Sequence, residues 1–225
     1  MNASLPVPYE ARRLTEKEIS ALDVRMFKSP KCGRMVHVAG VPCFCQALCY
    51  EFNPHIALFV ERPRHILVGD ESLELSFWIR YTNGKEQYVL VVPAVETEAA
   101  PEGRRKHRRA QQLLEAATKV GLELTFVFEA EFVARAGEVA TALRLLPHVQ
   151  VGRTLPQRGI LRDAIRKAVA GWPKIRLSEL QRALEDFDPS DVQAIAADLI
   201  HEGTLQIDRH APVSRHMLIS TGDGS

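Results

Sequence analysis

Apolar residues recur along the chain with two spacings, and each spacing predicts a different secondary structure. Apolar positions three to four residues apart predict a helix, whereas alternation of apolar and polar positions predicts a strand. Residues 42–52 have the helical spacing and are followed by Asn53-Pro54, so we expect a buried helix that ends there. Short β-rich runs at 56–60 and 65–68 predict two strands after it.

The strongest extended pattern lies at residues 73–93. Two alternating runs are joined there by Asn83-Gly84, a dipeptide that favours a tight turn between antiparallel strands. A β-rich run at 122–128 and a helical pattern at 137–146 follow later. Strands that flank helices in this order predict a mixed α/β sheet domain.

Two segments, one before the predicted helix at 42–52 and one after the predicted hairpin at 73–93, are rich in cations. Residues 27–37 are basic and turn-rich, and we expect them to form an exposed arm. The run 104–109 holds five Lys and Arg residues and is expected to open an amphipathic helix that Gly121 stops. Before both segments, Thr15 and Glu18 have the spacing of a capping box and predict a short helix.

The last third of the chain has a different pattern. Helices are expected at 160–170, 177–184 and 189–202, the third with Asp188 as its N-cap. Residues 204–220 then resemble two strands around a short polar loop. Three helices followed by a β-hairpin are typical of the winged variant of the helix-turn-helix. The predicted organisation is an N-terminal extension at 1–26, a sheet domain at 27–152 and a winged-helix domain at 153–225.

Composition excludes little. The chain has 225 residues, is 46% hydrophobic and 25% charged, and carries a net charge of +1, so no global positive field indicates a nucleic-acid partner. No apolar run reaches the length of a membrane span, and the N-terminus lacks the pattern of a secretory leader. We therefore expect a cytoplasmic protein.

Four cysteines lie close together, at Cys32, Cys43, Cys45 and Cys49. Their spacing does not match the paired C-x2-C pattern of zinc knuckles, and Cys45 and Cys49 share one helix face as buried small residues would. Buried thiols are the favoured interpretation, and a metal site or a redox role remains the alternative.

Five short motifs in a fixed order carry a resemblance to a known family. They are KSPKCGRMVHV at 28–38, EFNP at 51–54, SFWIRYTNG at 76–84, VLVVP at 89–93 and RRAQQLLEAATKVGLELTFV at 108–127. With the C-terminal pattern, they make the chain similar to TnsA, the endonuclease subunit of heteromeric transposases, from about residue 27 to the end. The resemblance implies an α/β, restriction-endonuclease-like mixed-sheet domain followed by a winged-helix domain. It also implies a bacterial, nucleoid-associated protein.

The positions that carry catalysis in that family are replaced in this chain. The resemblance implies a Glu in the helix before Asn53-Pro54, an Asp on the first hairpin strand, and Glu/Gln-x-Lys on the second. The residues at those positions are Cys43, Ser76, Leu90 and Val92. Mg²⁺ requires oxygen ligands, and a hydroxyl with two aliphatic side chains does not supply them. We therefore expect a catalytically inactive subunit with no metal or other cofactor.

One alternative keeps the nuclease activity. Glu74 and Glu86 are expected on the strand faces of Ser76 and Leu90, and Glu51 lies two turns after Cys43. If these carboxylates form a relocated site, the protein is a Mg²⁺-dependent endonuclease that cuts 5′ strands at transposon ends. Such a relocation requires several ligands to move together within a narrow tolerance.

Basic residues supply the candidate contacts to transposon-end DNA. These residues are Lys28, Lys31, Arg34, Arg104, Arg105, Lys106, Arg108, Arg109, Arg162, Arg166, Lys167, Arg209 and Arg215. The resemblance further implies two protein partners, a DDE transposase subunit and an AAA+ transposition regulator.

A third interpretation is a winged-helix regulator that binds DNA alone. The third predicted helix argues against it, because it contains Asp191, Asp198 and Glu202 and no Lys or Arg. We expect these carboxylates to repel a phosphate backbone, so the C-terminal domain is expected to bind protein.

Overall fold

The computed structural model describes residues 8–101 and 104–222, which form two compact units. The first unit comprises Met1–Ala47 and His55–Val133, and the second comprises Leu48–Pro54 and Ala134–Ser225. The division falls within helix α2 (Val41–Glu51), which begins in the first unit and ends in the second.

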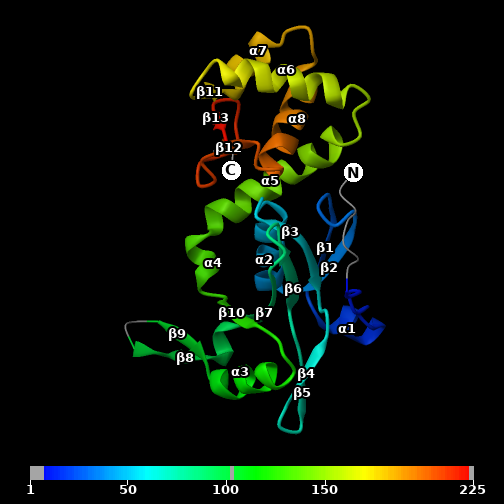
Figure 1. Ribbon diagram of the computed structural model, residues 1–225, viewed down its shortest axis with the longest axis vertical. Helices are drawn as coiled ribbons and strands as arrows, with labels where there is room; N and C mark the ends of the chain where they lie inside the picture. The colour runs from blue at the N-terminus through cyan, green and yellow to red at the C-terminus, as the bar shows by residue number, and fades with distance from the viewer. Residues whose placement is uncertain (1–7, 102–103, 223–225) are drawn as a thin grey trace. The chain divides into compact units, whose positions relative to one another are not determined.

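The first unit is a mixed α/β structure built around a four-stranded sheet (Figure 1). The strand order is β10-β7-β6-β3, in which β10 pairs with β7 in parallel and the other neighbours are antiparallel. The bounds of these strands are β3 Ile56–Glu61, β6 Phe77–Tyr81, β7 Glu86–Val92 and β10 Leu124–Phe128. The predicted hairpin is therefore confirmed, and Gly84 at its turn has a φ of +85°, which glycine adopts without strain.

Three two-stranded pairs accompany this sheet. They are β1 (Val24–Ser29) with β2 (Arg34–Ala39), β4 (His65–Val68) with β5 (Glu71–Glu74), and β8 (Thr97–Ala99) with β9 (Arg105–His107). The helical elements are α1 (Glu16–Ala21), η1 (Ala94–Glu96), α3 (Ala110–Lys119) and α4 (Glu131–Ala134). The capping box between Thr15 and Glu18 is confirmed at the start of α1.

Two predictions for the cationic segments are wrong. Residues 27–37 form most of the β1–β2 hairpin instead of an exposed arm. Arg105–His107 is strand β9, so most of the second cationic run lies in a hairpin and α3 begins only after it. In both cases pairing with a neighbouring strand decides the structure, and the charge of the segment does not reveal that pairing.

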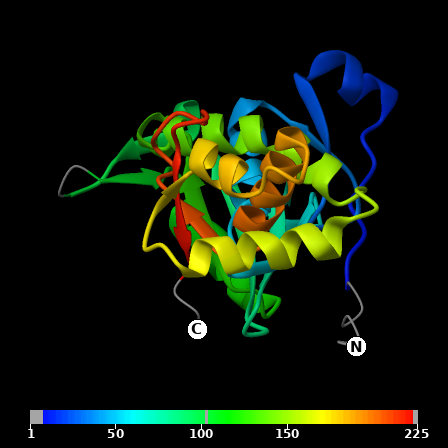
Figure 2. The ribbon, with the colours of Figure 1, turned by 90° about the horizontal axis from the view of Figure 1, so that it is seen from above.

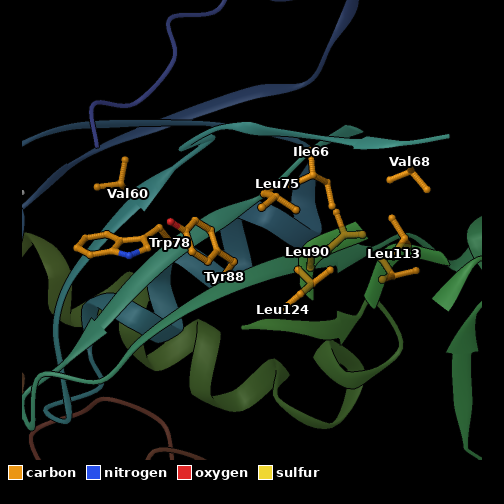
Figure 3. Close-up of a cluster of buried hydrophobic side chains, with 11 residues drawn as sticks. Val60, Ile66, Val68, Leu75, Trp78, Tyr88, Leu90, Leu113 and Leu124 are labelled. Atoms are coloured by element: carbon orange, nitrogen blue, oxygen red, sulfur yellow. The ribbon is translucent and has the colours of Figure 1, made fainter. Parts of the chain in front are cut away.

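One face of the four-stranded sheet packs against α3 through a buried apolar cluster (Figure 3). Trp78, Tyr88 and Leu90 from β6 and β7 lie in this cluster with Leu113 of α3 and Leu124 of β10. Burial of such side chains contributes about 25 cal/mol per Å² of apolar area removed from water, so the cluster stabilises the strands that surround Ser76.

The described part of the second unit contains helices α5 to α8 and a small sheet. The helices are α5 (Ala136–Gly152), α6 (Arg158–Ala170), α7 (Leu177–Ala183) and α8 (Pro189–His201). The three-stranded antiparallel sheet has the order β11-β13-β12, formed by Ile175–Arg176, Leu218–Thr221 and Leu205–Ile207. In Figure 2 the yellow α6 runs beside the orange helices α7 and α8.

Helix α5 packs closely against α8. A Cβ atom on Gly152 would lie 2.6 Å from the carbonyl oxygen of Ala194, so the absence of a side chain permits this approach. The N-cap of α8 is confirmed, because the Asp188 side chain accepts from the Ser190 amide. Among the described residues, no helix is long and apolar enough to cross a bilayer.

Candidate functional site

Ser76 lies in the bend just before β6, where its backbone and side chain are held by β7. Its amide donates to the Val89 carbonyl at 3.0 Å, and its Oγ accepts from the Val91 amide at 2.9 Å. The Ser76 side chain acts on the Cys43 thiol on the first turn of α2 and lowers its pKa, although burial of the thiol has the larger, opposite effect. Two of the four positions expected to be catalytic therefore lie near each other.

The polar groups at these positions are neutral. Burial raises the pKa of the Cys43 thiol to about 11, so the sulfur is protonated near pH 7. Ser76 contributes a hydroxyl. Leu90 and Val92 on β7 are buried in the apolar cluster, and Figure 3 shows Leu90 there. A divalent cation would find no anionic ligand among these four side chains.

Each of the three carboxylates of the alternative site has another partner. Glu74 bonds with Arg12, Glu86 accepts from Trp78 Nε1 at 3.1 Å, and Glu51 is 2.6 Å from His201 Nε2. Glu74 ends β5, which pairs with β4, so the prediction that it shares a strand with Ser76 is wrong. Within residues 8–101 and 104–222, no group of three His, Cys, Asp or Glu side chains is placed to hold a metal ion.

The β8–β9 hairpin presents the second cationic run to solvent. Arg104, Arg105, Lys106 and Arg108 are all exposed. Lys106 pairs with the exposed Glu98 at 3.0 Å, and Arg105 donates to the Thr97 hydroxyl at 3.1 Å. Exposed contacts of this kind are weak, so Arg105 and Lys106 remain available to an anionic partner.

Arg108 and Arg109 follow the hairpin and differ in their contacts. Arg109 pairs with Glu71 and donates to the Val68 carbonyl at 3.3 Å. Arg108 is exposed and makes no ion pair with any residue that the structure describes. Arg108 is therefore the more accessible of the two.

The first cationic segment is largely committed to internal contacts. Lys31 donates to the Ile56 carbonyl at 2.7 Å, and Arg34 forms two bonds of 2.6 and 2.7 Å with the buried Glu61. The hydrogen bond with Glu61 raises the pKa of Arg34. Lys28 is exposed on β1.

In the second unit, the basic and acidic residues of α6 and α8 neutralise one another. Arg162 donates to Asp198 at 2.9 Å and to Glu202 at 2.5 Å. Arg158 reaches the same two carboxylates at 2.7 and 3.1 Å. Asp198 has no exposed surface and also accepts from Arg153 at 3.1 Å. Both carboxylates therefore have arginine partners within this unit, and the expected repulsion of a phosphate backbone by this helix stays a prediction.

The remaining basic residues of the second unit are divided between internal contacts and the surface. Arg209 donates to the Phe52 carbonyl at 2.9 Å, and Arg215 donates to His216 at 3.1 Å. Arg166 is 3.6 Å from Asp163, and Lys167 is exposed. Arg209 is therefore engaged in an internal contact, whereas Arg166 and Lys167 are exposed.

The sequence contained a signal for the network between α6 and α8. Arg158 and Arg162 are four residues apart, as are Asp198 and Glu202, so each pair lies on one face of its helix. Two matched pairs of opposite sign on neighbouring helices favour an interhelical contact. No signal of that kind exists for Arg62, whose environment depends on three separate segments.

Comparison of the chain with protein-family models gave no match, and comparison with curated proteins gave none either.

Proposed function

We propose that this protein is a TnsA-like subunit that binds transposon-end DNA and does not cut it. In this proposal the mixed-sheet unit is a degenerate restriction-endonuclease-like domain. The helices α6 to α8 with the sheet β11-β13-β12 are a winged-helix domain. The order of helices and strands in both units is compatible with those folds.

One observation carries the proposal. Cys43 lies on α2, Ser76 lies in the bend before β6, and Leu90 and Val92 lie on β7, which are the elements where the resemblance implies the acidic residues and the lysine. In this proposal the four positions are a degenerate nuclease centre whose side chains are all neutral. A neutral, largely apolar site neither binds Mg²⁺ nor polarises water for attack on phosphorus.

DNA binding is assigned to the β8–β9 hairpin and its flanks. The exposed cations Arg104, Arg105, Lys106 and Arg108 are close in sequence on a two-stranded element. Contacts of Lys and Arg with phosphates release counterions and make the affinity fall with salt. The hairpin supplies such contacts without sequence specificity.

The subunit would act as a scaffold for a DDE transposase and an AAA+ regulator. Both partners are those that the resemblance implies. With this subunit inactive, the 5′ strands at the ends of the element would stay uncut unless another protein cleaves them.

The test uses the purified full chain and a linear duplex that carries an end of the mobile element. We expect salt-sensitive binding and no 5′-strand nicking in Mg²⁺ or Mn²⁺. Replacement of Arg105 and Arg108 by Gln should weaken binding, whereas Arg182→Gln, an exposed arginine of α7, should not. Metal-dependent nicking that Glu74→Ala abolishes would overturn the proposal in favour of the relocated nuclease.

A further inference from the structure

A groove of about 660 Å³ lies between strand β4 and helix α3 in the first unit. Every residue from 64 to 69 lines it, and Gln112, Ala116 and Lys119, which share one face of α3, line the other side. None of the described residues that line it belongs to the β8–β9 hairpin. Occupancy of the groove is therefore independent of the proposed binding to DNA.

The groove follows the free edge of β4. Successive residues of a strand point to opposite faces, so a groove lined by six residues in succession runs along the edge of the strand. No residue of β5 lines it, and β4 pairs with no other strand in the described part of the chain. The edge that borders the groove is therefore the one away from β5.

Two residues of β4 turn their backbone groups toward this edge. The Leu75 amide donates to the Arg64 carbonyl at 3.0 Å, so these two residues form a hydrogen-bonded pair. Because bonded and non-bonded pairs alternate in an antiparallel ladder, His65 and Leu67 direct their amides and carbonyls away from β5. Arg64 Nε donates to the His65 carbonyl at 3.5 Å. Both amides and the Leu67 carbonyl have no hydrogen-bonded partner among the residues that the structure describes.

The middle of this edge lacks the charges and prolines by which edge strands usually avoid pairing. Residues 66–68 are all apolar. Ile66 and Val68 are buried in the same cluster as Leu113 of α3 (Figure 3), whereas Leu67 is 72% exposed. An extended chain can therefore add to β4 without desolvating a charged side chain of residues 66–68.

The side chains that line the groove favour an acidic occupant. Arg64 and Lys119 form no ion pair with any residue that the structure describes, whereas His65 is 3.9 Å from Glu74. Glu115 is the one carboxylate among the described lining residues. Two cations against one carboxylate leave the groove with a net positive charge.

We propose that this groove binds an extended, acidic segment of a partner protein, which adds to β4 as a third strand. The backbone of the segment bonds with His65 and Leu67, the mode by which peptides extend an exposed sheet edge. Alternate side chains of the segment face α3, where the half-buried Ala116 leaves room for an apolar group. Carboxylates of the segment pair with Arg64 and Lys119. A second copy of this chain is less suitable, because its own β4 would bring the same cations.

The experiment titrates the full chain with a fluorescently labelled, amidated peptide of alternating Val and Thr flanked by Glu, and follows anisotropy. We expect saturable binding, and weaker binding of the same peptide with Lys in place of Glu. Arg64→Gln and Lys119→Gln should each weaken binding about two- to fivefold, which is the effect of one exposed ion pair. Lys17→Gln, at an exposed position of α1, is the matched control and should leave binding unchanged.

A variant of Leu67 tests the backbone contact. Leu67→Pro removes the outward amide and spares the hydrogen bonds between β4 and β5, so the variant should fold and lose binding. Leu67→Ala is its control, because it shortens the side chain but keeps the amide. Circular dichroism establishes that both variants are folded.

Hydrogen exchange of the unmodified chain supplies a second measurement that needs no variant. Peptide at ten times its dissociation constant should slow exchange of the His65 and Leu67 amides about 10-fold, since about one tenth of the chains remain free. The Ile66 and Val68 amides, which bond with β5, are the internal controls and should change less.

Absence of saturable binding, or equal binding by folded Leu67→Pro, would overturn the proposal. Exchange at His65 and Leu67 that bound peptide leaves unchanged would do the same. A dimer in light scattering whose His65 and Leu67 amides are protected without peptide would also overturn it, because a second copy then covers the edge. Failure of the proposed function is separate, since a protein that binds the peptide but no duplex retains this groove.

Discussion

The β8–β9 hairpin and helix α6 are both rich in basic residues, but the cations of the hairpin are exposed whereas arginines of α6 are paired with a buried carboxylate. The hairpin exposes Arg105 and Lys106, whose partners Thr97 and Glu98 hold them weakly. In the second unit, three arginines converge on the carboxylate of Asp198, which has no exposed surface. The difference teaches that the number of cations in a segment does not indicate a DNA surface, because pairing decides which of them remain available.

The network around Asp198 extends beyond α6 and α8. His201 lies 3.3 Å from Arg153 through Nδ1 and 2.6 Å from Glu51 through Nε2. The buried charges of α8 are thereby linked to the last turn of α2, within the second unit. Partnered charges of this kind orient helices, since each carboxylate must keep its donors once it is buried.

The largest expected effect tests whether this network is structural. Asp198→Ala leaves three arginines without their shared carboxylate, and loss of one partner from a buried ion pair costs about 3–5 kcal/mol of unfolding free energy. Denaturant unfolding followed by circular dichroism measures the change. Asp163→Ala is the control, because Asp163 is exposed on α6 and its loss should change stability by about 0.5 kcal/mol or less. Equal effects of the two variants would show that burial of Asp198 contributes nothing.

The next effect concerns DNA binding by the hairpin. Replacement of Arg105, Lys106 and Arg108 by Gln should remove up to three phosphate contacts and reduce the slope of log affinity against log salt by about 2.7. Fluorescence anisotropy with a labelled duplex at several salt concentrations gives this slope. The pair Arg158→Gln with Arg162→Gln should lower stability and leave the slope unchanged. If the α6 variant reduces this slope and the hairpin variant does not, DNA binding has been assigned to the wrong region.

A smaller effect on the unfolding free energy is expected when the pH is lowered. Burial alone would raise the pKa of Asp198, but hydrogen bonds from Arg158 and Arg153 outweigh it and hold the pKa below its ordinary value of 3.8. The ionised carboxylate therefore stabilises the fold above pH 3.8, and this contribution is lost as the pH falls through the lower pKa of the folded state. The difference in unfolding free energy between the unmodified chain and Asp198→Asn should narrow in acid. A difference independent of pH would contradict this account.

The smallest effect sharpens the description of the hairpin. Glu98→Gln removes the exposed partner of Lys106 and should change the unfolding free energy by about 0.5 kcal/mol or less. The same variant should raise DNA affinity slightly at low salt, since one negative charge leaves the surface. Anisotropy measured beside Glu115→Gln, an exposed glutamate of α3, separates the local effect from the change in net charge. A stronger effect from Glu115 would place the DNA on α3.

Local signals in the sequence predicted much of the secondary structure. The capping box at Thr15, the turn at Asn83-Gly84 and the N-cap Asp188 all act within a few residues, and each is present in the structure. Prediction failed at the β1–β2 and β8–β9 hairpins, where the partner strand supplies the hydrogen bonds. The identities of Cys43 and Ser76 were evident beforehand, but the effect of Ser76 on the Cys43 thiol depends on the fold that brings α2 near the bend before β6.

The sequence by itself determined the order of helices and turns and the neutral character of the four expected catalytic positions, because these depend on nearby residues and on side-chain chemistry. Only the tertiary structure decided which charges are available. No local pattern in the sequence marks Asp198 or Arg62 as buried, and their partners lie many residues away in the chain. Burial and pairing depend on long-range contacts, so a cation on the surface and a cation held in a network look the same until the chain is folded.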